Sequence, residues 1–354
     1  MFDLADILET TLRGGATGIS FVLAIALARG GEGANTRRLG ALFCFSSAVY
    51  FLLSGEATRA LFGSYLLLAS FPAVFGTIFF WWFAAALFDD NFRWRWWRFV
   101  PAIVIPLCHI GHILAPHGLL EKILWYGHIG MNAAMFLDGL RLALVNASDD
   151  LVNPRRRFRF AVAVTVGISG LLIASAETIE TNYLLPDAAR MFQAAATFLL
   201  EVVFAAWLLN PRLELFAEPH APVAADDGWA AHANEVRAAD RPAYDRLMAL
   251  MDEGVYREEG LTVARLAEKV GVPEHQLRKL INGALGFRNF SSFLNARRIA
   301  DARAALADPA NARKQVIQVA LDLGYGSIAP FNRAFKDATG KTPTEFRKET
   351  LGEA

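Results

Sequence analysis

Residues 263–272 read VARLAEKVGV, and residues 316–325 read VIQVALDLGY. Both stretches have apolar residues at helical spacing, an alanine at the fifth position and a glycine at the ninth. A small residue lets two helices cross closely, and a glycine allows the sharp turn between them. After each tight turn the sequence predicts a second helix. We therefore expect two helix-turn-helix units in the C-terminal third of the chain.

The charge distribution supports a nucleic-acid partner for these two units. A basic helix predicted at about 291–307 joins them. Residues 261–349 hold 15 basic and 8 acidic side chains, whereas residues 218–260 hold 4 basic and 10 acidic ones. A basic module behind an acidic segment, in a chain of zero net charge, favours binding to nucleic acid.

The spacing of particular residues extends this interpretation to a family. They are Arg298, Ile299, Ala302, Leu306, Val319, Ala320, Gly324, Tyr325, Phe331, Asn332, Arg333, Ala334, Phe335, Lys336, Gly340, Thr342 and Pro343. With this pattern, residues 244–349 resemble the AraC/XylS-type DNA-binding domain of bacterial transcription regulators. The stretch LGFRNF at 285–290 resembles the subgroup with a multi-spanning membrane N-terminus. The resemblance implies two recognition helices in successive major grooves, about 34 Å apart.

Helix position within the resemblance gives the candidate DNA contacts. The first recognition helix offers Glu274, His275, Gln276, Arg278 and Lys279, and the second offers Ser327, Ile328, Ala329, Asn332, Arg333 and Lys336. By side-chain geometry, Gln276 and Asn332 suit adenine, and Arg278 and Arg333 suit guanine. The expected phosphate contacts are Arg288, Arg297, Arg298 and Lys341.

The first two thirds of the chain are strongly apolar. Hydrophobic residues make up 54% of the chain and charged residues 20%, and the mean hydropathy is +0.30. Such values are too apolar for an ordinary cytosolic enzyme. We expect seven membrane-spanning helices, at about 11–28, 39–55, 66–88, 99–116, 122–145, 160–176 and 191–209.

The distribution of arginine and lysine around these spans predicts their orientation. With the N-terminus outside, the inward-facing loops carry 11 basic residues and the outward-facing ones 4. We therefore expect a sensor domain at 1–212 in the bacterial inner membrane. A juxtamembrane linker follows at 213–243, and the DNA-binding domain at 244–349 lies in the cytoplasm.

Polar residues within or beside the spans are candidates for signal sensing. They are His109, His112, His117, His128, Asp138, Arg141 and Glu201. The histidines suit a metal or proton sensor, or are polar residues at helix ends. No carboxylate cluster completes a metal site, so we expect no metal. Asp138 and Arg141, three residues apart, form either a structural pair or a signalling site.

The sequence lacks the patterns of catalysis, so we expect neither an enzyme nor a cofactor. No nucleophile stands beside a base in a recognisable motif, and no glycine loop has the lysine that phosphate binding needs. The whole pattern predicts an all-α, membrane-tethered transcription regulator. Its expected partners are double-stranded DNA and the lipid bilayer, with RNA polymerase contact and a homodimer through membrane helices as further candidates. The alternative is a seven-span receptor or transport protein whose C-terminal module binds a protein partner.

Overall fold

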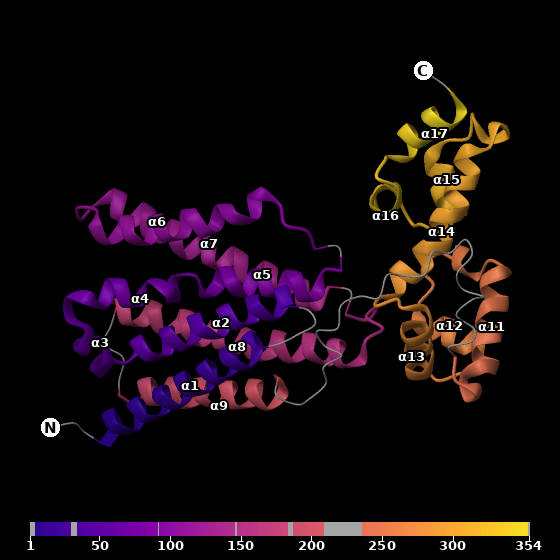
Figure 1. Cartoon of the computed structure of the whole chain (residues 1–354). Helices are drawn as coiled ribbons and strands as arrows, with labels where there is room; N and C mark the ends of the chain where they lie inside the picture. Colours follow the sequence, from indigo (N-terminus) through magenta and orange to yellow (C-terminus); the bar gives the residue numbers. More distant parts are fainter. Residues whose placement is uncertain are drawn as a thin grey trace. The chain divides into compact units, whose positions relative to one another are not determined.

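A computed structural model describes residues 4–29, 34–90, 92–145, 147–182, 187–208 and 236–352. Within these ranges the chain is all-helical, and its one β pairing is an isolated antiparallel bridge between Asp150 and Asn289. The chain divides into two compact units (Figure 1). The first comprises Met1–Ala147 and Arg157–Glu218, and the second comprises Ser148–Arg156 and Pro219–Ala354.

The first unit is a bundle of long helices. Its elements are α1 (Leu4–Ala28), α2 (Ala34–Ser54), α3 (Glu56–Phe62), η1 (Gly63–Tyr65), α4 (Leu66–Val74), α5 (Gly76–Phe88), η2 (Trp96–Phe99), α6 (Val100–Leu114), α7 (Leu119–Leu144), most of α8 (Asn153–Asn182) and α9 (Asp187–Leu208). Helix α5 is central, since nine of its residues are buried. Arg159 on α8 is buried and donates hydrogen bonds to the carbonyls of Phe88 and Leu142, at the ends of α5 and α7.

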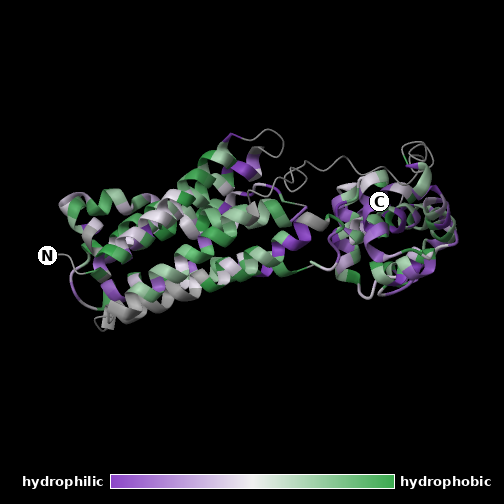
Figure 2. Ribbon diagram, turned by 90° about the horizontal axis from the view of Figure 1, so that it is seen from below, coloured by the Kyte–Doolittle hydropathy of each residue, from purple (hydrophilic) through white to green (hydrophobic). Residues whose placement is uncertain are grey.

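The bundle exposes large apolar side chains as well as burying them. Ile103 and Leu107, one turn apart on α6, are 61% and 63% exposed, and green, hydrophobic residues run along most of the bundle helices in Figure 2. Exposed apolar surface of this extent is typical of helices that face lipid.

The expectation of seven membrane spans needs correction. A helix lies at each of the seven places, but only three candidates in the described ranges are long and apolar enough to cross a bilayer. These three are Asp6–Ala28, Thr58–Phe88 and Trp96–Leu114. The other helices carry charged residues within their length, as α7 does at Asp138 and Arg141, or have a shorter apolar part, as α9 does at Met191–Ala206.

The second unit is a module of short helices. They are α11 (Arg241–Asp252), α12 (Val263–Val270), α13 (Glu274–Leu285), α14 (Phe290–Ala307), α15 (Val316–Asp322), α16 (Ile328–Thr339) and α17 (Pro343–Leu351), with single turns η5 (Ala238–Asp240), η6 (Val255–Arg257) and η7 (Pro309–Asn311). Of the linker expected at 213–243, residues up to 235 lie outside the described ranges, and α11 begins before its end.

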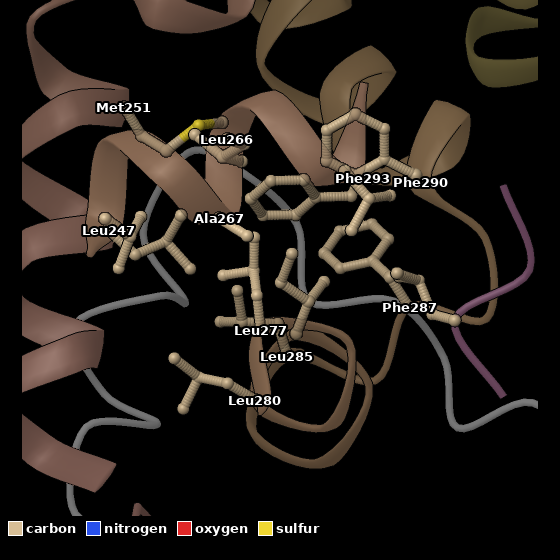
Figure 3. Packing of buried hydrophobic residues seen from close by; sticks show 14 of the residues in the cluster. Leu247, Met251, Leu266, Ala267, Leu277, Leu280, Leu285, Phe287, Phe290 and Phe293 are labelled. Atoms are coloured by element: carbon tan, nitrogen blue, oxygen red, sulfur yellow. The ribbon is translucent and has the colours of Figure 1, made fainter. Parts of the chain in front are cut away.

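Two hydrophobic cores build this module, one under each helix-turn-helix unit. The first core gathers side chains from α11 to α14 and includes Leu277 and Phe293 (Figure 3). The second joins α14 to α15, α16 and α17 around Phe331 and Phe335. Since α14 contributes to both cores, it is the structural link between the two helix-turn-helix units.

Candidate nucleic-acid interface

Helix α16, the second expected recognition helix, presents a polar face to solvent. Phe331 and Phe335 are wholly buried, so the residues between them in the helical repeat point outward. Most of the residues predicted from the sequence are on this outer face. Ser327, Ala329, Asn332, Arg333 and Lys336 are exposed, and Ile328 is half-buried.

The outer face of α16 is available to a ligand. Among the described residues, no hydrogen bond or ion pair engages the side chains of Asn332 and Arg333. An arginine and an asparagine one position apart on an open helix face are the groups that read guanine and adenine. The proline at position 330 lies in the first turn, where it costs no hydrogen bond.

Helix α13, the first expected recognition helix, is less open. His275 and Lys279 are exposed. Gln276 donates to a carboxylate oxygen of Asp240 at 3.2 Å. Glu274 accepts from Arg278, which is only 4% exposed.

The four residues expected at phosphates have different environments. Lys341 is exposed and pairs with Glu349. Arg288 and Arg297 are half-buried, and Arg297 pairs with Asp252 at 3.2 Å. Arg298 is buried, and the phosphate contact expected of it does not fit this position.

Arg298 instead ties the two helix-turn-helix units together. Its Nε donates to the carbonyl of Tyr256 at 2.7 Å, its second terminal nitrogen donates to the carbonyl of Glu258, and its guanidinium lies 5.1 Å from the centre of the Tyr325 ring. Burial lowers the pKa of Arg298, and the nearby Tyr325 partly opposes this effect. Because α14 joins the two helix-turn-helix units, the inward-facing Arg298 stabilises the packing of one unit against the other.

A polar cluster around Asp301 completes this junction and was not predicted from the sequence. Asp301 accepts from the Tyr256 hydroxyl at 2.6 Å and pairs with Arg257 at 2.7 Å. Gly324, with φ of +80°, brings its backbone against the carbonyl oxygen of Arg257. The glycine at the ninth position of the second repeat was visible in the sequence, but its partner on η6 was not.

Three of the four histidines proposed for sensing lie together in the first unit. The ring centre of His109 is 5.1 Å from that of His128 and 5.4 Å from that of His112, and Trp125 lies 4.8 Å from His112. His117 is separate and pairs with Glu121 at 3.1 Å. Within the described ranges, no group of histidine, cysteine or acidic residues has the geometry of a metal site.

The charged residues inside the bundle are placed differently. Asp138 accepts from the indole nitrogen of Trp81 at 2.8 Å and from Arg141 at 2.7 Å. Glu201 is half-buried on α9. The contacts of Asp138 join α5 to α7, which favours the structural alternative for the Asp138–Arg141 pair.

Comparison with known proteins places the second unit in a domain family. Residues 266–349 match the family described as a helix-turn-helix domain. The C-terminus is an AraC-type helix-turn-helix domain. This domain implies DNA binding, and the exposed face of α16 agrees with that implication.

Matches to curated proteins cover only part of the chain. A stretch of 89 residues is 36% identical to an uncharacterized HTH-type transcriptional regulator of Staphylococcus aureus strain MSSA476. Regulators with the same description in strains N315 and MW2 give the same values. The stretch is 25% of this chain and 11% of each relative, so the chain matches about a tenth of their length. No solved structure is significantly similar to the chain.

Proposed function

We propose that the chain is a membrane-tethered, sequence-specific transcription regulator, not an enzyme, that responds to a signal in the membrane or outside it. The observation that carries the DNA-binding part is the open outer face of α16, on which Asn332 and Arg333 have no partner among the described residues. These groups suit base edges in the major groove, and Lys336 beside them suits a phosphate.

Selection from random duplexes tests the DNA-binding part directly. The full chain in lipid nanodiscs is mixed with duplexes that carry a 40-base-pair random region, and bound duplexes are sequenced over several rounds. We expect a two-part motif with a spacing of about one DNA turn. Affinity should also fall steeply with salt, because phosphate neutralisation releases counterions. Binding without any sequence preference would refute a sequence-specific regulator.

The proposed tether rests on the three apolar candidate spans and on the exposed apolar side chains of the bundle. The sequence asymmetry of basic residues supports an N-terminus outside and a C-terminal module in the cytoplasm of a bacterium. This orientation requires an odd number of crossings. Reporter fusions test it: alkaline phosphatase should be active at the N-terminus only, and green fluorescent protein should be fluorescent at the C-terminus only.

We propose that the signal acts by changing the packing of the bundle helices. A signal that stabilises one arrangement shifts the population of the module that is able to bind DNA. RNA polymerase and a second copy of the chain are the proposed protein partners. A genome-wide map of sites occupied by the full chain, made with and without Arg333→Ala, identifies the promoters on which to test them.

A further inference from the structure

The short connection between α7 and α8 contributes residues 148–152 to the second unit, and we call these residues the docking segment. Its backbone pairs with the chain between α13 and α14. The amide of Leu151 donates to the carbonyl of Arg288 at 2.8 Å, and the amide of Phe290 donates to the carbonyl of Asp149 at 2.8 Å. These two bonds surround the antiparallel bridge of Asp150 with Asn289. The docking segment is therefore held by the main chain as an added strand is held at a sheet edge.

Side chains make this contact specific. Leu151 is 2% exposed and is part of the first hydrophobic core. The magenta ribbon of this region passes beside Phe287 in Figure 3. Asp150 is wholly buried, and its carboxylate lies 3.0 Å from Nε of the equally buried Arg155. This buried ion pair joins the docking segment to the first turn of α8.

The docking segment also occupies Arg278, a residue expected to read DNA. One terminal nitrogen of Arg278 donates to the carbonyl of Asp150 and the other to the carbonyl of Ser148, both at 2.7 Å. Its Nε donates to Glu274 at 2.8 Å. A bidentate contact with guanine uses the same N–H groups. Arg278 therefore serves either the docking segment or a base, and not both.

We propose that the docking segment is an internal competitor of DNA on the first helix-turn-helix unit. This inference rests on the proposed DNA-binding function. When the segment is docked, α13 offers His275 and Lys279 but not Arg278, and DNA is held mainly by α16. When it is released, Arg278 is free to turn to the major groove. Because the docking segment is covalently joined to α7 and α8, a movement of these helices acts on it directly.

The competition predicts how affinity depends on docking. Only the undocked fraction binds DNA through both helices, so the overall affinity for DNA falls as that fraction falls. A covalent lock should weaken binding, and a weakened dock should strengthen it. Both changes can be made outside the recognition helices.

The lock uses a contact that the structure already makes. The Ser291 hydroxyl donates to a carboxylate oxygen of Asp149 at 2.9 Å, so the tips of these side chains are adjacent. In a background with Cys44→Ala and Cys108→Ala, the double variant Asp149→Cys/Ser291→Cys should form a disulfide on oxidation. The matched control is Ser291→Cys alone. The release variant is Leu151→Ser, which removes the apolar anchor of the docking segment.

The readout is affinity for a duplex obtained by selection with the reduced full chain in lipid nanodiscs. We expect the oxidised lock to bind at least tenfold more weakly than the same protein after reduction, and Ser291→Cys to show no such difference. We expect Leu151→Ser to bind severalfold more tightly than the unaltered chain. The oxidised and reduced lock are one protein, so this comparison is independent of any folding defect in Leu151→Ser.

Other outcomes separate the two proposals. If the oxidised lock binds as its reduced form does, the competition is wrong and sequence-specific DNA binding stands. Failure of the disulfide to form would also overturn the competition, because the contact would then be absent from the protein in solution. If neither the reduced lock nor Leu151→Ser selects any motif, DNA recognition itself is wrong.

Discussion

Replacing Gly324 with alanine tests the junction between the two helix-turn-helix units. Gly324 has φ of +80°, and a left-handed backbone costs an L-residue about 1–2 kcal/mol. A Cβ at this position would lie 2.3 Å from the carbonyl oxygen of Arg257 and 2.7 Å from its carbonyl carbon, which are backbone atoms. Relieving such an overlap typically costs a further ~1–3 kcal/mol. We therefore expect Gly324→Ala to destabilise the second core by about 2–5 kcal/mol.

Gly340 provides the matched control. Its φ is +77°, but nothing lies within 4 Å of the Cβ that alanine would add. Gly340→Ala should therefore show the backbone cost alone, about 1–2 kcal/mol. The difference between the variants, about 1–3 kcal/mol, measures the close approach of Gly324 to η6.

Hydrogen exchange of the full chain in detergent micelles gives this difference. The amides of α15 and α16 report the opening free energy of the second core. A difference of 1–3 kcal/mol corresponds to exchange that is about 5- to 150-fold faster in Gly324→Ala than in Gly340→Ala. Equal exchange in the two variants would show that the backbone of Gly324 does not pack against Arg257 in solution.

Three further predictions concern the same module. Arg298→Ala leaves the carbonyl of Tyr256 unpaired and should lower the opening free energy by about 1–3 kcal/mol in the same exchange measurement. Arg303→Ala, at an exposed site on α14, should change it by no more than ~0.5 kcal/mol. Equal losses in the two variants would contradict the buried role of Arg298. Arg333→Ala should weaken binding to a selected duplex by ~1–3 kcal/mol and relax one base position, while Arg333→Lys should retain phosphate-type affinity without the base preference; a preserved preference in Arg333→Lys would exclude bidentate reading. Burial raises the pKa of Tyr325 from its ordinary value of 10.0 to about 12. The stability that comes from keeping Tyr325 neutral is therefore fully present below pH 10.0 and is lost as the pH rises to about 12. In this pH range the free energy of unfolding should fall less for Tyr325→Phe than for the unaltered chain. If it falls equally in both, ionisation of Tyr325 does not destabilise the fold.

The pair of helix-turn-helix units was predictable because its signals are local. Ala320 is wholly buried, and Gly271 and Gly324 both have positive φ, as the repeated alanine and glycine predicted. A close helix crossing and a sharp turn each need a particular small residue at a fixed place. The sequence records such needs within about ten residues.

The roles of individual arginines were less predictable. Arg297 and Arg298 are neighbours on a basic helix, and the sequence does not distinguish the half-buried one from the buried one. Which arginine turns inward depends on the distant carbonyl of Tyr256. Arg278 is similar, because its partner in the docking segment is 128 residues away in the chain.

The apolar half shows the limit of counting hydrophobic residues. The sequence predicted helices at the right places, because an apolar stretch of about 20 residues is helical in either a membrane or a helix bundle. It overestimated the number that qualify as spans. Charged residues such as Asp138 and Arg141 have partners across the bundle or on their own helix, and the sequence gives these contacts no visible pattern.

The docking segment has a consequence for the order in which the protein folds. Its bridge to Asn289 joins residues separated by more than a hundred positions, and closing so long a loop carries a large entropic cost. Apart from Leu151, the buried side chains of the first core lie between residues 243 and 294, and we expect these to assemble first. We therefore expect the bridge to close last during folding and to be among the first tertiary contacts to open on heating. During synthesis, residues 148–152 emerge well before the surface that will bind them. A newly made module therefore passes through a period in which the docking segment does not yet cover Arg278.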